Sequence, residues 1–178
     1  AIYTLSLLTA LPMLVCVSLE AEFEVIAIAV EALEVVGISD LTLDLTAAPL
    51  IVLLADACGL NEAEKAGVIT ALDAKDSGFF DSLTSDAKTQ FEALMGVTGP
   101  AESAIERLSA IHVTGKAADL VDRLTRLVGL LAKRLPNLPV TLDPCETHGF
   151  EYKSGIGFAL FSKSGNGELG RGGRYLVK

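Results

Sequence analysis

The sequence is poor in the side chains that hold metal ions or build disulfide frameworks. Its three cysteines, Cys16, Cys58 and Cys145, are far apart and form no C-x-x-C pair, and its only histidines are His112 and His148. Structural zinc sites need closely spaced sulfur and nitrogen ligands. We therefore expect no metal site, and reduced, mostly buried thiols in a cytoplasmic protein.

Positive charge is also scarce. The chain has 14 Lys and Arg residues against 23 Asp and Glu residues, which gives a net charge of −9 and a pI near 4.7. A surface this acidic repels the phosphate backbone of nucleic acids. The composition therefore argues against a nucleic-acid partner, and the length of 178 residues fits one domain.

Residues 1–19, AIYTLSLLTALPMLVCVSL, contain no charged side chain. A stretch of this length is a candidate membrane span or signal-peptide core. However, it has no initiator Met and no basic region before it, Pro12 interrupts it, and three glutamates follow at positions 20, 22 and 24. We expect an atypical apolar segment, either a buried strand or a fragment end, and no membrane role.

The segment 165–170, GNGELG, matches the G-x-G-x-x-G pattern of dinucleotide-binding folds. That motif needs a strand before the glycines and a helix after them, because the helix N-terminus receives the pyrophosphate. Only eight residues follow Gly170, so the sequence offers no helix, second strand or acidic ribose partner. The pattern instead predicts a glycine-rich turn between two strands.

Hydrophobic periodicity predicts an α+β fold. Apolar residues recur at helical spacing over residues 21–36, 47–58 and 114–135, and segment 60–113 reads as shorter helical pieces between glycines and prolines. Alternating residues predict strands at 40–46, at 140–142 and, ahead of the glycine turn, at 150–160. Two strands joined by a tight turn pair antiparallel, so a doubly wound sheet is not expected.

Two C-terminal motifs carry a family resemblance. The segments 148–161, HGFEYKSGIGFALF, and 168–175, ELGRGGRY, resemble the paired histidine motifs of class II histidyl-tRNA synthetases. The residues of these two motifs, together with VTLDP at 140–144, are more similar to the corresponding residues of the synthetase-like regulatory subunit of ATP phosphoribosyltransferase. Upstream segments are also similar, so the resemblance covers about residues 21–176. It implies part of a class II synthetase-like antiparallel sheet with helices, in which residues 60–113 form a helical insertion of a single partial domain, 1–178.

The chain departs from the catalytic members of that family. The synthetases carry a motif arginine for ATP ahead of this region, whereas the first arginine here is Arg107. His148 replaces the arginine of the first histidine motif, and a neutral imidazole offers phosphate neither a permanent charge nor a guanidinium fork. We therefore expect no adenylate chemistry and no cofactor, as in a fragment or shortened member of the non-catalytic branch.

The resemblance also implies a tentative histidine site. Glu151 and Tyr152 match the acidic residue and the following tyrosine that the family has in its histidine pocket. Arg174 and Tyr175 match the second motif. Lys153 stands where the synthetases have a second tyrosine, which weakens the case for ligand binding. The alternative is that Tyr152 is an ordinary sheet aromatic. Counting outward from a turn near residue 164 predicts that Tyr175 lies beside the start of the first strand.

Two functions of different classes remain open. The first is a non-catalytic regulatory subunit that pairs with a short-form ATP phosphoribosyltransferase catalytic chain, in a homo- or hetero-oligomer, and responds to L-histidine in the first step of histidine biosynthesis. The second is a fragment of a histidyl-tRNA synthetase catalytic domain. A structural domain with no surviving activity is a third alternative. The missing arginines, His148 and the acidic charge balance favour the regulatory subunit.

Overall fold

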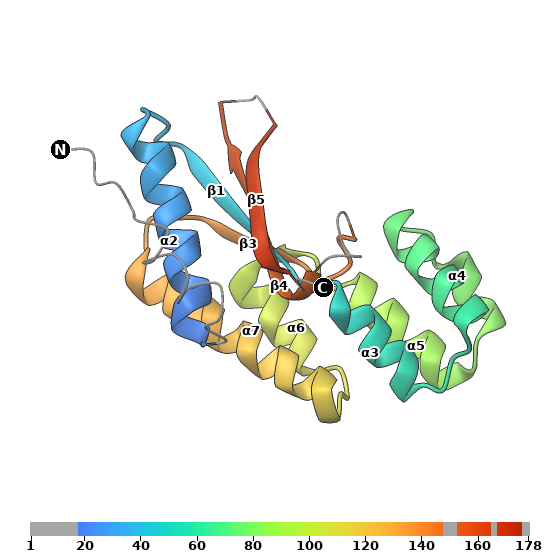
Figure 1. Ribbon diagram of the computed structural model, residues 1–178. Helices are drawn as coiled ribbons and strands as arrows, with labels where there is room; N and C mark the ends of the chain where they lie inside the picture. The colour runs from blue at the N-terminus through green and yellow to red at the C-terminus, as the bar shows by residue number, and fades with distance from the viewer. Residues whose placement is uncertain (1–17, 148–152, 165–166, 176–178) are drawn as a thin grey trace.

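The computed structural model describes residues 18–147, 153–164 and 167–175. Figure 1 shows its elements, which are helices α2 (Leu19–Val35), α3 (Pro49–Ala57), α4 (Glu62–Asp73), α5 (Ser85–Met95), α6 (Ala101–Ser109) and α7 (Gly115–Arg134), the 3-10 helix η1 (Ser77–Ser82), and strands β1 (Leu41–Thr46), β2 (Gly99–Pro100), β3 (Val140–Asp143), β4 (Lys153–Ser162) and β5 (Glu168–Tyr175). The predicted helices 21–36, 47–58 and 114–135 and strands 40–46 and 140–142 are confirmed, apart from small shifts at their ends.

The strands form one mixed sheet in the order β2-β3-β1-β4-β5. β4 pairs antiparallel with both β1 and β5, and β2 pairs antiparallel with β3. β1 and β3 are parallel, which their long helical connection allows. The predicted α+β class with an antiparallel β4–β5 pair is confirmed. The position of β1 between β3 and β4 was not predicted, because nothing local in the sequence specifies it.

One face of the sheet is covered by helices. The leucines of β1, Leu41, Leu43 and Leu45, alternate with polar residues and are buried on that face. α2 packs against α7 and β5, and α7 also packs against α3, α6 and β4 (Figure 1). α7 buries one stripe and ends on Lys133 and Arg134, whose charges suit the helix C-terminus. The opposite face of β1 carries Thr42, Asp44 and Thr46.

The segment 60–113 contains α4, η1, α5, β2 and α6. Asn61 starts α4 with a capping box, because its side chain accepts from the amides of Ala63 and Glu64 while the Glu64 carboxylate accepts from the Asn61 amide. Phe80 of η1 packs on Phe91 of α5 with ring centroids 5.9 Å apart. β2 ties the segment to the edge of the sheet beside β3.

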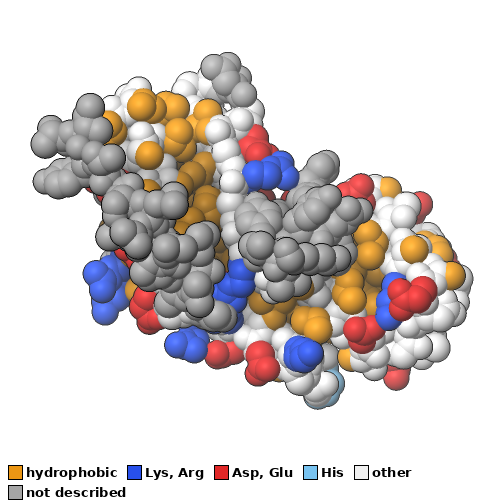
Figure 2. All heavy atoms as spheres, in the orientation of Figure 1, with side chains coloured by type: hydrophobic (Ala, Val, Ile, Leu, Met, Phe, Trp, Pro, Cys, Tyr) orange, Lys and Arg blue, Asp and Glu red, His pale blue; other side chains and the backbone are white. Residues whose placement is uncertain are grey.

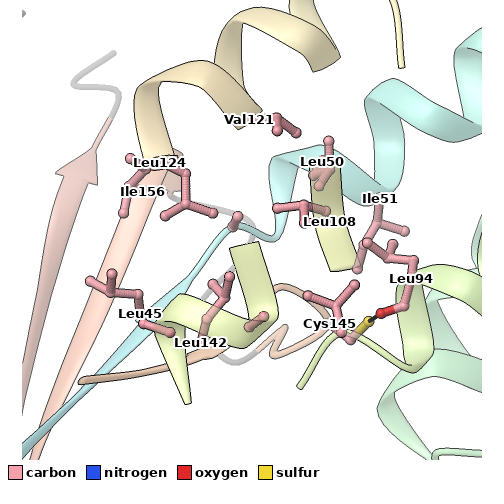
Figure 3. Close-up of a cluster of buried hydrophobic side chains, with 14 of the residues drawn as sticks. Leu45, Leu50, Ile51, Leu94, Leu108, Val121, Leu124, Leu142, Cys145 and Ile156 are labelled. Carbon is pink, nitrogen blue, oxygen red and sulfur yellow. Dashed lines mark hydrogen bonds between the residues drawn. The ribbon is translucent and has the colours of Figure 1, made fainter. Parts of the chain in front are cut away.

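The core lies where the sheet meets these helices. Figure 3 shows Leu45, Leu124 and Ile156 together at the centre of the helix-covered face, with Leu50 and Leu108 beside them. At the end of β3, the buried Cys145 thiol donates to the carbonyl of Leu94 over 3.7 Å, which fastens the sheet to α5. Cys58 is half-buried.

Among the described residues, every helix is too short or too polar to cross a membrane. Residues 1–17, which make up most of the apolar N-terminal segment and include Cys16, lie outside the described residues.

Candidate functional site

The two strands of the histidine motifs pair as predicted. Lys153, the first described residue of β4, lies opposite Tyr175 of β5. The register that brings the second motif beside the start of the first is therefore confirmed. Residues 148–152 lie outside the described residues, and with them the predicted site residues Glu151 and Tyr152. No helix follows the glycine turn, since residues 168–175 form β5, which agrees with the rejection of the dinucleotide motif.

Arg174 extends from β5 toward α2. Its Nη2 atom lies 3.1 Å from Oε1 of Glu22, an ion pair without the alignment of a hydrogen bond. Arg123 of α7 donates from Nε to the other oxygen, Glu22 Oε2, over 2.8 Å. The Glu22 side chain is only 11 % exposed. One carboxylate thus joins α2, α7 and β5, and the motif arginine takes part in that junction.

Two motif glycines allow β4 and β5 to approach closely. A Cβ on Gly172 would meet Cζ of the Phe158 ring at 2.5 Å, and one on Gly173 would meet the Gly157 Cα at 3.1 Å. Gly173 also has φ of +155°, which side chains rarely adopt. Gly172 and Gly173 therefore serve close packing between the strands, whereas a Cβ on Gly170 would meet no atom within 4 Å.

The face of the sheet opposite these helices carries a hollow of about 240 Å³. It is lined by residues from β1, β4, β5 and the loop after β3, namely Asp44, Thr46, Glu146, Phe158, Ala159, Phe161, Glu168 and Arg171. Asp44 lies opposite Ala159, and Ala159 lies opposite Arg171, so the small alanine side chain leaves space between two charged neighbours. The Lys153–Tyr175 pair lies farther along the same two strands, β4 and β5.

The electrostatics of the hollow are dominated by carboxylates. Burial, together with nearby Asp143 and Glu146, raises the pKa of Asp44, although a hydrogen bond from the Thr141 hydroxyl to Oδ1 at 2.5 Å opposes the shift. Arg171 forms a two-atom ion pair with Glu168. The described lining residues thus include three carboxylates and one guanidinium, and nearby Lys75 also opposes the upward shift of the Asp44 pKa.

Sequence reasoning missed Asp44, Glu146 and Arg171 as neighbours, and it missed Glu22 as the partner of Arg174. The alternation of DLTLDLT does place Asp44 on the face opposite the leucines, which is a usable signal. The pairing of β1 with β4 and the bulge in β5 bring the other residues beside it. In the described part of the chain, His, Cys, Asp and Glu side chains form no group that could hold a metal ion.

A family model described as histidyl-tRNA synthetase matches residues 15–178. ATP phosphoribosyltransferase regulatory subunits from Rhodospirillum centenum and Rhodospirillum rubrum are both 40% identical to the chain over 156 residues, which is 88% of its length. The chain spans 40% of the first relative and 41% of the second.

Solved structures show the same fold. A crystal structure of an ATP phosphoribosyltransferase regulatory subunit/histidyl-tRNA synthetase from Bacillus halodurans superposes with a TM-score of 0.77 at 24% identity, covering 90% of this chain and 44% of that one. The ATP phosphoribosyl transferase (HisG:HisZ) complex from Thermotoga maritima gives 0.70 at 17% identity, covering 90% and 58%. These structures share the fold, and the sequence matches give the chain its family. It belongs to the histidyl-tRNA synthetase-like family that includes the ATP phosphoribosyltransferase regulatory subunits.

Proposed function

We propose that this chain is part of a regulatory subunit of ATP phosphoribosyltransferase, acts in the first step of histidine biosynthesis and has no chemistry of its own. Relatives with that name match 88% of the chain at 40% identity. The observation that carries the proposal is the position of Arg174. Its guanidinium is paired with Glu22 on the helix-covered face, so this motif cation stabilises the fold.

The proposed partner is a short-form ATP phosphoribosyltransferase catalytic chain. A complex between the two kinds of subunit is known for the Thermotoga maritima structure whose fold this chain shares. The proposal places the chain in the cytoplasm as a member of a hetero-oligomer, where Cys58 and Cys145 remain reduced thiols.

We place the proposed histidine-responsive site at the strand pair that carries Glu151, Tyr152, Arg174 and Tyr175. A carboxylate and phenols can accept and donate hydrogen bonds to an ammonium and an imidazole. The pairing of Lys153 with Tyr175 supports this location, because it brings the ends of both motifs together. Arg174 contributes by holding β5 against α2 through Glu22.

The test uses a complex of the catalytic chain with a regulatory polypeptide that contains this sequence. Glu151→Gln should weaken inhibition by histidine about tenfold while leaving assembly intact, because it removes one charge partner and almost no volume. Exposed Glu106 on α6 provides the matched control, Glu106→Gln. Histidine inhibition that is unchanged in Glu151→Gln would place the sensing site elsewhere.

A second measurement addresses the absence of catalysis. The same polypeptide should give no histidine-dependent exchange of pyrophosphate into ATP, because His148 replaces the motif arginine and Arg174 is paired with Glu22. An exchange signal above that of a buffer blank would overturn the proposed regulatory function.

A further inference from the structure

The loop after β3 contacts segment 60–113 and leads into the first histidine motif. It runs from Asp143, the last residue of β3, to Thr147, and the next residue along the chain is His148, where that motif begins. The proposed function gives segment 60–113 no role. The contacts between this segment and the loop therefore bear on what the segment does.

Hydrogen bonds from the loop to the C-terminal end of α4 hold both ends of the loop. At its start, the Lys75 ammonium, just beyond α4, donates to Oδ2 of Asp143 over 2.9 Å. At its end, the Thr147 hydroxyl donates to Oδ1 of Asp73, the last residue of α4, also over 2.9 Å. The described chain thus enters the first histidine motif from a loop that segment 60–113 holds in place.

The Asp143 carboxylate is central to this attachment. Its side chain is only 15 % exposed, and its other oxygen, Oδ1, accepts from the backbone amide of Cys145 over 2.9 Å. One carboxylate therefore links Lys75 to the backbone of the loop. Loss of the Lys75 ammonium would remove a positive charge that this largely buried carboxylate contacts, and the loop could then shift.

The backbone of Lys75 supplies an independent observation. Its φ of +53° makes it the one non-glycine residue with positive φ among those described. It follows the end of α4, where its amide donates to the Leu72 carbonyl and the Asp76 amide donates to the Ala71 carbonyl. Glycine is the usual residue at this position because it has no Cβ. A lysine there carries a conformational cost, which its side-chain contact with Asp143 offsets.

We propose that Lys75 is a positioning residue for the histidine-responsive site. It holds the loop from which the first histidine motif continues, and that motif carries Glu151 and Tyr152. Lys75 acts through the loop and needs no contact with histidine. This inference rests on the proposed function, because the site is the one proposed above.

The test uses the same complex of the catalytic chain with a regulatory polypeptide that contains this sequence. Lys75→Gly removes the ammonium and should stay folded, since glycine adopts the left-handed conformation without a Cβ clash. This variant should weaken inhibition by histidine about threefold. Lys75→Arg keeps a charge that can reach Asp143 and should restore the inhibition. Assembly and activity without histidine should be unchanged in both variants.

Asp143→Asn removes the other half of the ion pair but keeps an oxygen for the Cys145 amide. It should also weaken inhibition about threefold. The double variant with Lys75→Gly should be inhibited no more weakly than either single variant, because the two side chains act as one contact. Lys116→Gln, at an exposed position on α7, removes one positive charge and should leave inhibition unchanged. Thermal melts establish that each variant is folded, and Lys75→Gly decides the question if Asp143→Asn does not fold.

The inference is wrong if histidine inhibits Lys75→Gly as strongly as the original complex, or if Lys75→Arg is inhibited as weakly as Lys75→Gly. A double variant that shows the full product of the two single effects would also overturn it. Glu151→Gln separates this inference from the proposed function. Weaker inhibition in Glu151→Gln with no change in Lys75→Gly overturns the role of Lys75 alone, whereas an original complex that histidine does not inhibit overturns both.

Discussion

At the scale of single residues, burial determines the chemistry of the side chains that can ionise. Cys145 is buried beneath Leu94 and beside Asp143, and burial is the main cause that raises the pKa of its thiol to about 12. Burial and the nearby Asp86 also raise the pKa of Cys58, but that residue is half-buried. Neither environment resembles the electropositive, exposed setting of a reactive cysteine.

Native Cys145 should therefore react with iodoacetamide much more slowly than Cys58 at about pH 8, because only an accessible thiolate attacks the reagent. Peptide mass spectrometry after timed quenching measures both rates. In concentrated guanidinium chloride the two should react at similar rates, which is the control. Equal labelling of both cysteines in the native chain would contradict the packing of Cys145.

Asp44→Asn should stabilise the chain more at neutral than at acidic pH. Burial raises the folded-state pKa of Asp44 above its usual 3.8, so the original chain loses stability as pH rises from 3.8 through the folded value. The asparagine does not ionise and can still accept from Thr141. Urea unfolding of both chains between about pH 3 and 7 measures the effect.

The stability difference between the two chains should grow with pH across that window. Asp119→Asn, at an exposed position on α7, is the control for loss of one negative charge. A stability difference for Asp44→Asn that stays constant with pH would show that the Asp44 carboxylate is not penalised by burial.

At the scale of elements, Gly172 leaves room for an aromatic ring from the opposite strand of the β4–β5 hairpin. Phe158 lies directly opposite Gly172, and its ring covers the position that a Cβ there would take. Gly170 is on the same strand and has open space at its Cβ position. The two glycines look alike in the sequence, and only the cross-strand partner distinguishes them.

Gly172→Ala should lower the free energy of unfolding by about 1–3 kcal/mol, because the ring of Phe158 must move out of the core. Gly170→Ala should change it by less than about 0.5 kcal/mol. Urea denaturation of both variants makes the comparison. Equal losses in the two would mean that general strand effects outweigh the contact with Phe158.

At the scale of the whole molecule, Glu22 joins elements from both ends of the described chain. Its two oxygens meet Arg123 of α7 and Arg174 of β5 at 2.8 and 3.1 Å. Hydrophobic side chains also remain exposed on α2, among them Ile28, Val35 and Val36, and Figure 2 shows apolar side chains gathered over this end of the molecule. At the other end of α2, the contacts of Glu22 with Arg123 and Arg174 hold the helix against α7 and β5.

Glu22→Gln should cost about 2 kcal/mol of stability, because it removes the negative charge that two partly buried guanidinium groups contact. Glu24→Gln, on an exposed position of the same helix, should cost almost nothing. Thermal or urea unfolding of the two variants tests this. If Glu22→Gln is no less stable than Glu24→Gln, the junction contributes nothing measurable to the fold.

The sequence by itself determined the order of the helices and strands, the antiparallel β4–β5 pair and the family. These features are local, since periodicity reports the buried side of each element and a short connection sets the register of Lys153 against Tyr175. The structure agrees at residues 165–170, because Glu168–Tyr175 form strand β5 where a dinucleotide motif needs the start of a helix.

Only the tertiary structure decided which distant residues meet. The pairing of β1 with β3 and β4, the contact of Glu22 with Arg123 across 101 positions, and the gathering of Asp44, Glu146 and Arg171 around Ala159 all depend on long-range packing. Such contacts form once the apolar faces of the sheet and helices are buried together, and many sequences with the same periodicity satisfy that burial in different ways. The hollow and the Glu22 junction are therefore properties of the folded chain that its local patterns do not encode.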